Sequence, residues 1–158
     1  MASFESTIDD RYFEDYRVGE TYEFGPAEVT EERILSFAEE FDPQPFHTDP
    51  KAAVDGPFGG LIASGWHTCG IMMRLYADHY LSRVASLGGP GVDELRWLAP
   101  VRPGDRLSVR ATVEQARTSR SKPDRGLVHT RVEVVNQNGD VVLSAVVLNF
   151  LRLRGAAT

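Results

Sequence analysis

The sequence has few of the features that would place it outside the ordinary globular proteins. Its single cysteine, Cys69, leaves no partner in the chain for a disulfide and no multi-cysteine metal site. No apolar run approaches the length of a membrane-spanning helix, and the opening MASFESTIDD lacks the basic and apolar regions of a secretory leader. Internal repeats and low-complexity segments are also missing. We therefore expect a cytoplasmic location, with neither secretion nor membrane insertion.

The charge pattern and the motifs exclude further classes of protein. The formal net charge is -6, with acidic and basic residues mixed along the chain, so nucleic acid and membranes are not expected as partners. HExxH, phosphate-loop and Rossmann glycine motifs are absent, because GGPGVD precedes a predicted strand rather than a helix. We expect no metal and no cofactor. With 42% apolar and 25% charged residues in 158, the chain has the composition of one soluble globular domain.

Two helices are predicted in the first half of the chain. The first begins after the cap residue Thr30 and places an apolar stripe on one face. It ends near Phe41, because the prolines of Asp42-Pro-Gln-Pro-Phe-His47 predict a rigid, extended segment. The second helix is predicted from about Ser64 to Val84, after the glycines of GPFGGLIAS. Because it is apolar on most sides, it should be surrounded by other structure.

The second half of the chain predicts a sheet that could surround this helix. Strands are expected at VDELRWLAP, around 107–113, around 128–134 and over 141–153, with turns at RPGD and NQNGD. The last run, VVLSAVVLNFL, is apolar at nearly every position, so a neighbouring subunit or a central place in the sheet should cover its second face. We predict an α+β fold and at least a dimer.

Two features carry chemistry. Asp42 and His47 lie on a proline-stiffened segment, where a carboxylate and an imidazole could share one water and move its protons. Ser64 and Gly65 begin the long helix, whose unpaired amides and positive dipole end favour a developing oxyanion. Each feature alone also fits a plain structural role, as a turn cap with a packed histidine and as a helix cap after a glycine-rich bend.

Together the segments DPQPFH, TDPKAA, GGLIASGWHT and LAPVRPGD resemble the MaoC-like dehydratases, which include the R-specific enoyl-CoA hydratases. The resemblance runs from about residue 12 to 153, and we predict a single domain over residues 1–158. It implies a hot-dog fold, in which an antiparallel sheet wraps a long central helix, and a homodimer or higher homo-oligomer. It also implies that Asp42 and His47 activate water for addition to an enoyl thioester, while the Gly65 amide polarises the thioester carbonyl.

The substrate implied by the resemblance is an acyl-CoA or an acyl-carrier thioester. Gln44 stands where the enoyl-CoA hydratases commonly have asparagine, and Ser64 replaces a frequent histidine. We expect Gln44, Ser64, Trp66 and Phe58 to bind substrate, with Met73 and Trp97 as further wall candidates and His67 behind the site. Two alternatives remain open: a hot-dog acyl-CoA thioesterase, or a non-catalytic subunit that binds acyl thioesters.

Overall fold

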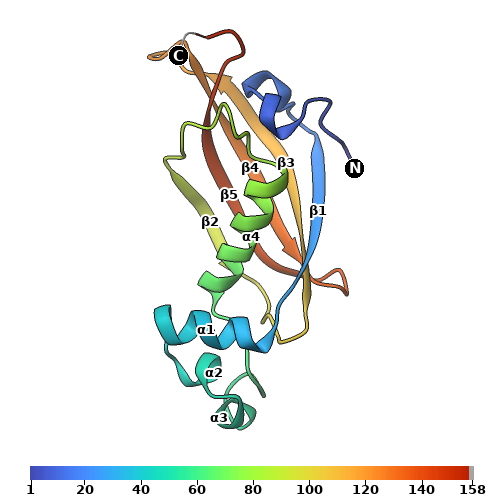
Figure 1. Cartoon of the computed structure of the whole chain (residues 1–158), viewed down its shortest axis with the longest axis vertical. Helices are drawn as coiled ribbons and strands as arrows, with labels where there is room; N and C mark the ends of the chain where they lie inside the picture. Colours follow the sequence, from blue (N-terminus) through green and yellow to red (C-terminus); the bar gives the residue numbers. More distant parts are fainter. Residues whose placement is uncertain (157–158) are drawn as a thin grey trace.

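The computed structural model describes residues 1–156 and contains one five-stranded antiparallel sheet around a central helix. The sheet order is β1-β3-β4-β5-β2. Its strands are β1 (Thr21–Glu28), β2 (Gly91–Trp97), β3 (Arg106–Thr118), β4 (Arg125–Val135) and β5 (Val141–Arg152). Figure 1 shows helix α4 (Gly65–His79) lying along one face of this curved sheet. The predicted α+β architecture is therefore confirmed.

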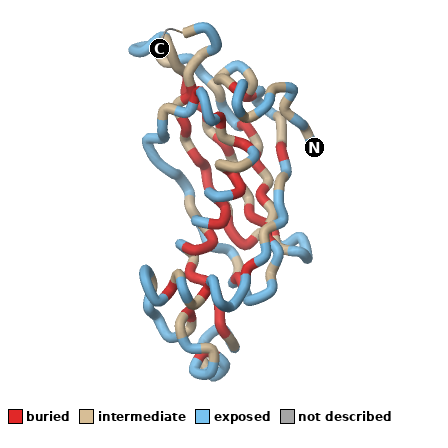
Figure 2. The backbone as a smooth tube through the Cα atoms, in the orientation of Figure 1, coloured by how far each residue is buried: buried red, intermediate tan, exposed pale blue. Residues whose placement is uncertain are grey.

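The two longest strand pairs follow the predicted alternation. Leu107, Val109, Ala111 and Val113 on β3 are fully buried, and their neighbours along the strand are more exposed. A turn with Gly139 at φ 85° joins β4 to β5 in the predicted hairpin. Strand β5 lies between β4 and β2, so its continuous apolar run belongs to an interior strand. Figure 2 shows the buried residues concentrated where these strands face α4.

Strand β1 was not predicted from the sequence. Its apolar signal is short, because Tyr22 and Phe24 alternate with polar residues only until Gly25 and Pro26 interrupt the pattern. The pairing of β1 with β3 shifts register between Phe24 and Ala27, at this same point. A proline is tolerated there because β1 is an edge strand, where one row of amides has no strand partner.

Helix α4 is shorter than predicted, since it ends at His79 rather than near Val84. No glycine or proline in the sequence marks this end. The last carbonyls instead accept hydrogen bonds from Arg11, which donates to the oxygens of His79 (2.8 Å) and Tyr80 (2.7 Å). Beyond the helix, the Ser82 side chain accepts from the amides of Val84 and Ala85. A contact remote in sequence therefore closes the helix.

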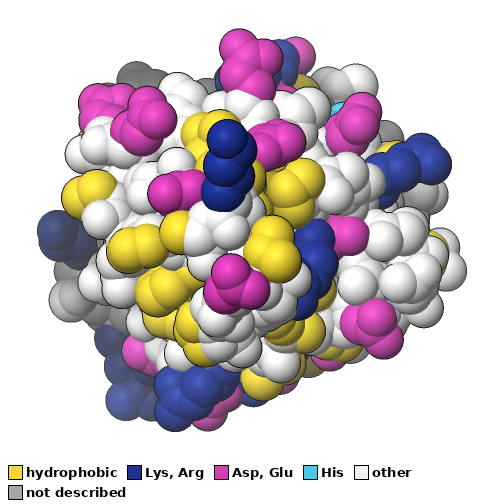
Figure 3. Space-filling view, turned by 90° about the horizontal axis from the view of Figure 1, so that it is seen from below, with side chains coloured by type: hydrophobic (Ala, Val, Ile, Leu, Met, Phe, Trp, Pro, Cys, Tyr) yellow, Lys and Arg dark blue, Asp and Glu magenta, His cyan; other side chains and the backbone are white. Residues whose placement is uncertain are grey.

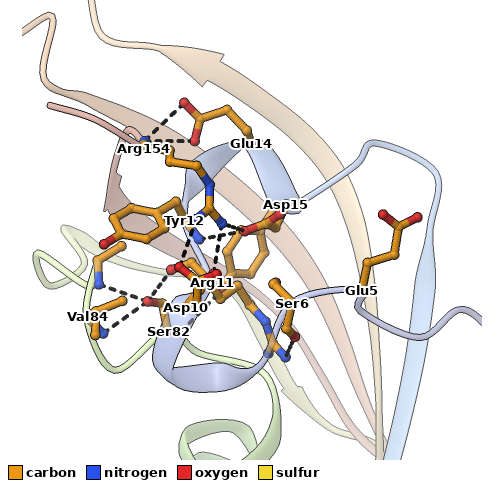
Figure 4. Close-up of polar contacts among 12 residues, drawn as sticks. Glu5, Ser6, Asp10, Arg11, Tyr12, Glu14, Asp15, Ser82, Val84 and Arg154 are labelled. Carbon is orange, nitrogen blue, oxygen red and sulfur yellow. Dashed lines mark hydrogen bonds and ion pairs between the residues drawn. The ribbon is translucent and has the colours of Figure 1, made fainter.

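The N-terminal segment packs against this end of the sheet and helix. Two short 3-10 turns, Ile8–Asp10 and Phe13–Asp15, lie beside the C-terminal residues (Figures 1 and 4). The Arg154 guanidinium donates to the Asp10 and Asp15 side chains at 2.8 and 3.0 Å. Arg11 lies 3.5 Å above the ring of Phe4, which stacks on Tyr22. These contacts join the two ends of the chain.

The opposite end of the molecule carries three smaller helices, α1 (Glu31–Phe41), α2 (Pro45–Thr48) and α3 (Pro50–Val54). Helix α1 agrees with the prediction, and its cap Thr30 accepts from the Arg33 amide at 3.3 Å. The prediction of an extended DPQPFH segment was wrong after Gln44. Pro45 begins a helix, because the first helical position needs no amide donor. Seen from this end, apolar side chains gather among charges of both signs (Figure 3).

None of the helices within residues 1–156 is both long enough and apolar enough to cross a membrane.

Candidate active site

Asp42 and His47 come together at the end of the molecule where α1, α2 and the start of α4 meet. Asp42 directly follows α1, and its amide donates to the Ala38 carbonyl at 2.9 Å, which fixes where its side chain leaves the helix. His47 lies in α2 and is 5% exposed. The Nε2 atom of His47 and the Oδ2 atom of Asp42 are 3.4 Å apart. The short turn between them therefore brings the predicted pair together.

The hydrogen-bond partner of His47 determines its tautomer. Its Nδ1 atom lies 2.8 Å from the Ile62 carbonyl oxygen, which can only accept a hydrogen bond. Nδ1 therefore carries the proton, and in the neutral ring Nε2 has the free lone pair. Because Nε2 faces the carboxylate of Asp42, two acceptors lie side by side with no proton between them. A water molecule that donates to both would satisfy this arrangement.

Both oxygens of Asp42 accept hydrogen bonds. Ser64 Oγ donates to Oδ2 at 2.7 Å, and Gln44 Nε2 donates to Oδ1 at 2.6 Å. The hydrogen bond from Ser64 is the main cause that holds the pKa of Asp42 below its usual value. Partial desolvation opposes it, and smaller contributions from Gln44 and His47 lower the pKa further. Asp42 is therefore an anion at neutral pH and can accept a proton or a hydrogen bond but cannot donate one.

Gly65 is the first residue of α4, and the first amides of a helix have no acceptor within the helix. Its lack of a side chain is required by Trp97. A Cβ atom built on Gly65 would lie 2.4 Å from Cε2 and 2.5 Å from Nε1 of that indole. The Trp66 ring meets the Trp97 ring edge to face, with 5.1 Å between centroids. Two indoles thus border the amide end of the helix.

These groups open into one cavity of about 510 Å³. Six of the seven predicted site residues line it: Asp42, Gln44, His47, Phe58, Gly65 and Trp66. Ser64 does not line the cavity and is fully buried behind it. Of the further wall candidates, Trp97 lines the cavity and Met73 does not. The floor and remaining walls are mainly apolar, from Phe46, Ile62, Ala63, Thr68, Leu98, Ala99, Pro100, Val101 and Val142.

Several of these lining residues were missed by sequence reasoning. Ile62 acts through its backbone carbonyl, which no side-chain pattern reveals. Residues 98–101 belong to the LAPV segment, which was recognised as part of a motif but not as a wall of the site. Val142 reaches the cavity from β5, far along the chain, because β5 pairs with β2. Only the sheet order could have pointed to this residue.

His67 was expected behind the site and lies elsewhere. Its ring stacks on Phe37 of α1, with 5.0 Å between centroids, and faces a separate groove between α1 and α4. Burial is the main cause that lowers the pKa of His67, so this ring is neutral at physiological pH. Among residues 1–156, no three histidine, cysteine or acidic side chains are grouped so that they could hold a metal ion.

The sheet wrapped around α4 and the carboxylate-imidazole pair beside its first amide define a hot-dog protein with a candidate site for acid-base chemistry. A Mycobacterium tuberculosis protein described as having a double hot-dog fold matches 97% of this chain and 47% of its own, with a TM-score of 0.79 and 16% identity. That likeness shows the fold. Residues 14–138 match the family model described as "MaoC like domain", and the chain belongs to that family.

Two relatives are more similar in sequence. A MaoC-like dehydratase from Rhodospirillum rubrum is 41% identical, with a TM-score of 0.85 over 91% of this chain and 98% of that one. The 3-hydroxyacyl-thioester dehydratase Z of Mycobacterium tuberculosis is 30% identical over 136 residues, which are 85% of this chain and 88% of that protein. The family suggested by the sequence motifs is therefore confirmed.

Proposed function

We propose that this protein is a hydratase or dehydratase that adds water to, or removes it from, the 2,3-double bond of an enoyl thioester. One observation carries the proposal. The Nε2 atom of His47 and the Oδ2 atom of Asp42 are 3.4 Å apart, and with the neutral ring protonated at Nδ1 both atoms can accept from one water in a cavity that Gly65 also lines. The name of the related 3-hydroxyacyl-thioester dehydratase supports a thioester as the substrate.

In the direction of hydration, the water donates one hydrogen bond to Asp42 and the other to His47. Its oxygen attacks C3 of the enoyl thioester while His47 Nε2 takes the proton, and the π electrons move onto the thioester oxygen. The amide of Gly65, at the positive end of α4, stabilises this enolate oxygen. When the enolate collapses, C2 takes the proton from the His47 imidazolium. Dehydration uses the same steps in reverse.

Asp42 stays ionised throughout this cycle. The hydrogen bonds from Ser64 and Gln44 that lower its pKa make protonation unfavourable near neutral pH. Its negative charge stabilises the imidazolium that forms on His47, and its Oδ2 fixes the second hydrogen of the water. His47 therefore acts as the general base and then the general acid, and Asp42 as the group that orients the water.

A homodimer formed through the β2 edge is part of the proposal. The two edges of the sheet differ, because β1 is interrupted at Pro26 whereas β2 exposes apolar side chains. Val92, Trp97 and Leu98 are each between 46% and 56% exposed, and Trp66 beside them is 58% exposed. Since Trp66, Trp97 and Leu98 also line the cavity, a second copy on this edge would close its open side. The molar mass, measured by light scattering on the protein as it elutes from a size-exclusion column, tests the assembly. The mass of a monomer would contradict the proposed dimer.

The reaction is tested by following the absorbance of the conjugated thioester in a panel of short, branched and aromatic enoyl-CoA substrates. We expect the wild type to consume this absorbance, and His47→Gln and Asp42→Asn to lose at least about 100-fold in kcat/KM. His67→Gln is the matched control, because His67 faces another groove, and it should retain activity. Release of free CoA thiol would instead indicate the thioesterase alternative. Binding without turnover would indicate the non-catalytic one.

A further inference from the structure

Ser64 is buried with 0% of its surface exposed, at the junction between the glycine-rich loop and α4. Its hydroxyl makes two hydrogen bonds. Oγ donates to Asp42 Oδ2 at 2.7 Å and accepts from the amide of Trp66 at 3.2 Å, which makes Ser64 the cap of α4. Because Ser64 does not line the cavity, a substrate bound there would not contact it.

The direction of these hydrogen bonds is fixed by chemistry. The Trp66 amide can only donate, so Ser64 Oγ accepts there, and the hydroxyl has one hydrogen left for Asp42. The anionic carboxylate can only accept it. The Trp66 amide, at the positive end of α4, therefore donates to Ser64, and Ser64 donates to Asp42 Oδ2. Oδ2 is also the oxygen that faces His47 Nε2. Gln44 binds the other oxygen, from an exposed position.

We infer that Ser64 is a positioning residue, which ties the carboxylate of Asp42 to the first turn of α4 so that Oδ2 faces His47. This inference rests on the proposed function, and it replaces the expectation that Ser64 binds substrate. A short side chain suffices here because α4 begins directly beside Asp42.

Few other charges bear on Asp42. Among residues 1–156, His47 is its one ion-pair partner, and Asp42 and His47 are the titratable side chains in the cavity lining. On α1, Glu39 and Glu40 are exposed, and on α4 His67 faces the separate groove. A change in the protonation of Asp42 on replacement of Ser64 would therefore report the lost hydrogen bond.

The first test compares Ser64→Ala with Ser64→Thr and Thr30→Ala. We expect Ser64→Ala to lower kcat by about tenfold to 100-fold with KM unchanged, because it removes a bond to Asp42 rather than to substrate. Ser64→Thr, which keeps the hydroxyl, should recover most of kcat. Thr30→Ala removes the cap of α1 and should lower the melting temperature while kcat is retained. Equal losses of kcat in Ser64→Ala and Thr30→Ala would overturn the inference.

The second test needs no catalytic activity. The carboxyl carbon of Asp42 can be titrated by ¹³C NMR, with its signal assigned by comparison with Asp42→Asn. Loss of the Ser64 donor disfavours the charged form, so in Ser64→Ala the midpoint should rise by about one pH unit. An unchanged midpoint would refute the role of Ser64. If the midpoint rises but the wild type hydrates no enoyl thioester, the inference about Ser64 stands and the proposed function fails.

Discussion

Replacement of Gly65 by alanine tests the packing at the amide end of α4. The new Cβ would lie 2.4 Å from Cε2 of Trp97, whereas ordinary contacts begin at 3.4 Å, so the indole must move by about 1 Å or more. Trp97 is 46% exposed in the single chain, so it can move outward at the expense of its contacts with the second copy in the proposed dimer. We expect a cost of about 1 kcal/mol, at the low end for overpacking. This corresponds to a fall in melting temperature of about 2–4 °C for a chain of this size.

The effect on activity should be far larger than the effect on stability. The added methyl group and the displaced indole both occupy the space beside the amide that would bind the thioester oxygen. A displacement of about 1 Å at a reacting group costs on the order of 100-fold in rate. Steady-state kinetics with an enoyl-CoA, together with thermal unfolding of the same preparation, separate the two effects.

The matched control is Gly70→Ala on the same helix, where an added Cβ meets no heavy atom within 4 Å. This variant should keep its activity and gain up to about 1 kcal/mol from the better helix propensity of alanine. The double variant Gly65→Ala/Trp97→Ala should recover part of the lost activity, because it removes the indole that conflicts with the methyl group. A Gly65→Ala protein as active as wild type, or a Gly70→Ala protein as impaired, would refute the reasoning.

Three further predictions concern charge and burial. Burial raises the pKa of Tyr16 to about 12 from 10.0. The stability that its neutral form contributes should therefore persist below pH 10 and decline as pH rises through 12, by up to about 1.4 kcal/mol per pH unit. A free energy of unfolding, followed by circular dichroism, that does not change with pH across this range would contradict the prediction. Arg11→Met removes the donor to the His79 carbonyl and one of the two donors to the Tyr80 carbonyl, which keeps the Tyr16 hydroxyl. The variant should cost about 2 kcal/mol in urea unfolding, and a loss below about 1 kcal/mol would show that these bonds matter little. An enoyl thioester that ends in a carboxylate should react at least about 100-fold more slowly than its methyl counterpart, since the residues within 1–156 that line the cavity include no lysine or arginine and Asp42 is anionic. Comparable kcat/KM values for the two substrates would exclude this.

The parts of the fold that follow from local patterning could be predicted from the sequence. The alternation around Val109 and Val132, the hairpin at Gly139 and the capped helix after Thr30 all depend on neighbouring residues. The errors arose where distant contacts decide the structure. Helix α4 ends where Arg11 binds its last carbonyls, and β1 exists because β3 offers it a partner despite Pro26.

The candidate site also has a part that could be predicted from the sequence and a part that depends on distant contacts. Its polar side chains Asp42, His47 and Gln44 lie close together in the sequence and were recognised as one motif. The partners that set their state are contributed by other segments. The Ile62 carbonyl fixes the tautomer of His47, and the Ser64 hydroxyl binds Asp42 from a buried position that the sequence alone suggested would contact substrate. The hydrogen-bond partners of these residues therefore required the three-dimensional structure, although the residues themselves could be named from the sequence.

The claim that Asp42 and His47 direct one water to the double bond is tested most directly by turnover in ¹⁸O-labelled water. Mass spectrometry of the product should find one ¹⁸O atom in a 3-hydroxyl group with the thioester bond intact, and His47→Gln should form almost none of this product. Recovery of the label in a free carboxylate, together with CoA thiol, would contradict the account, because the water would then have attacked the carbonyl carbon.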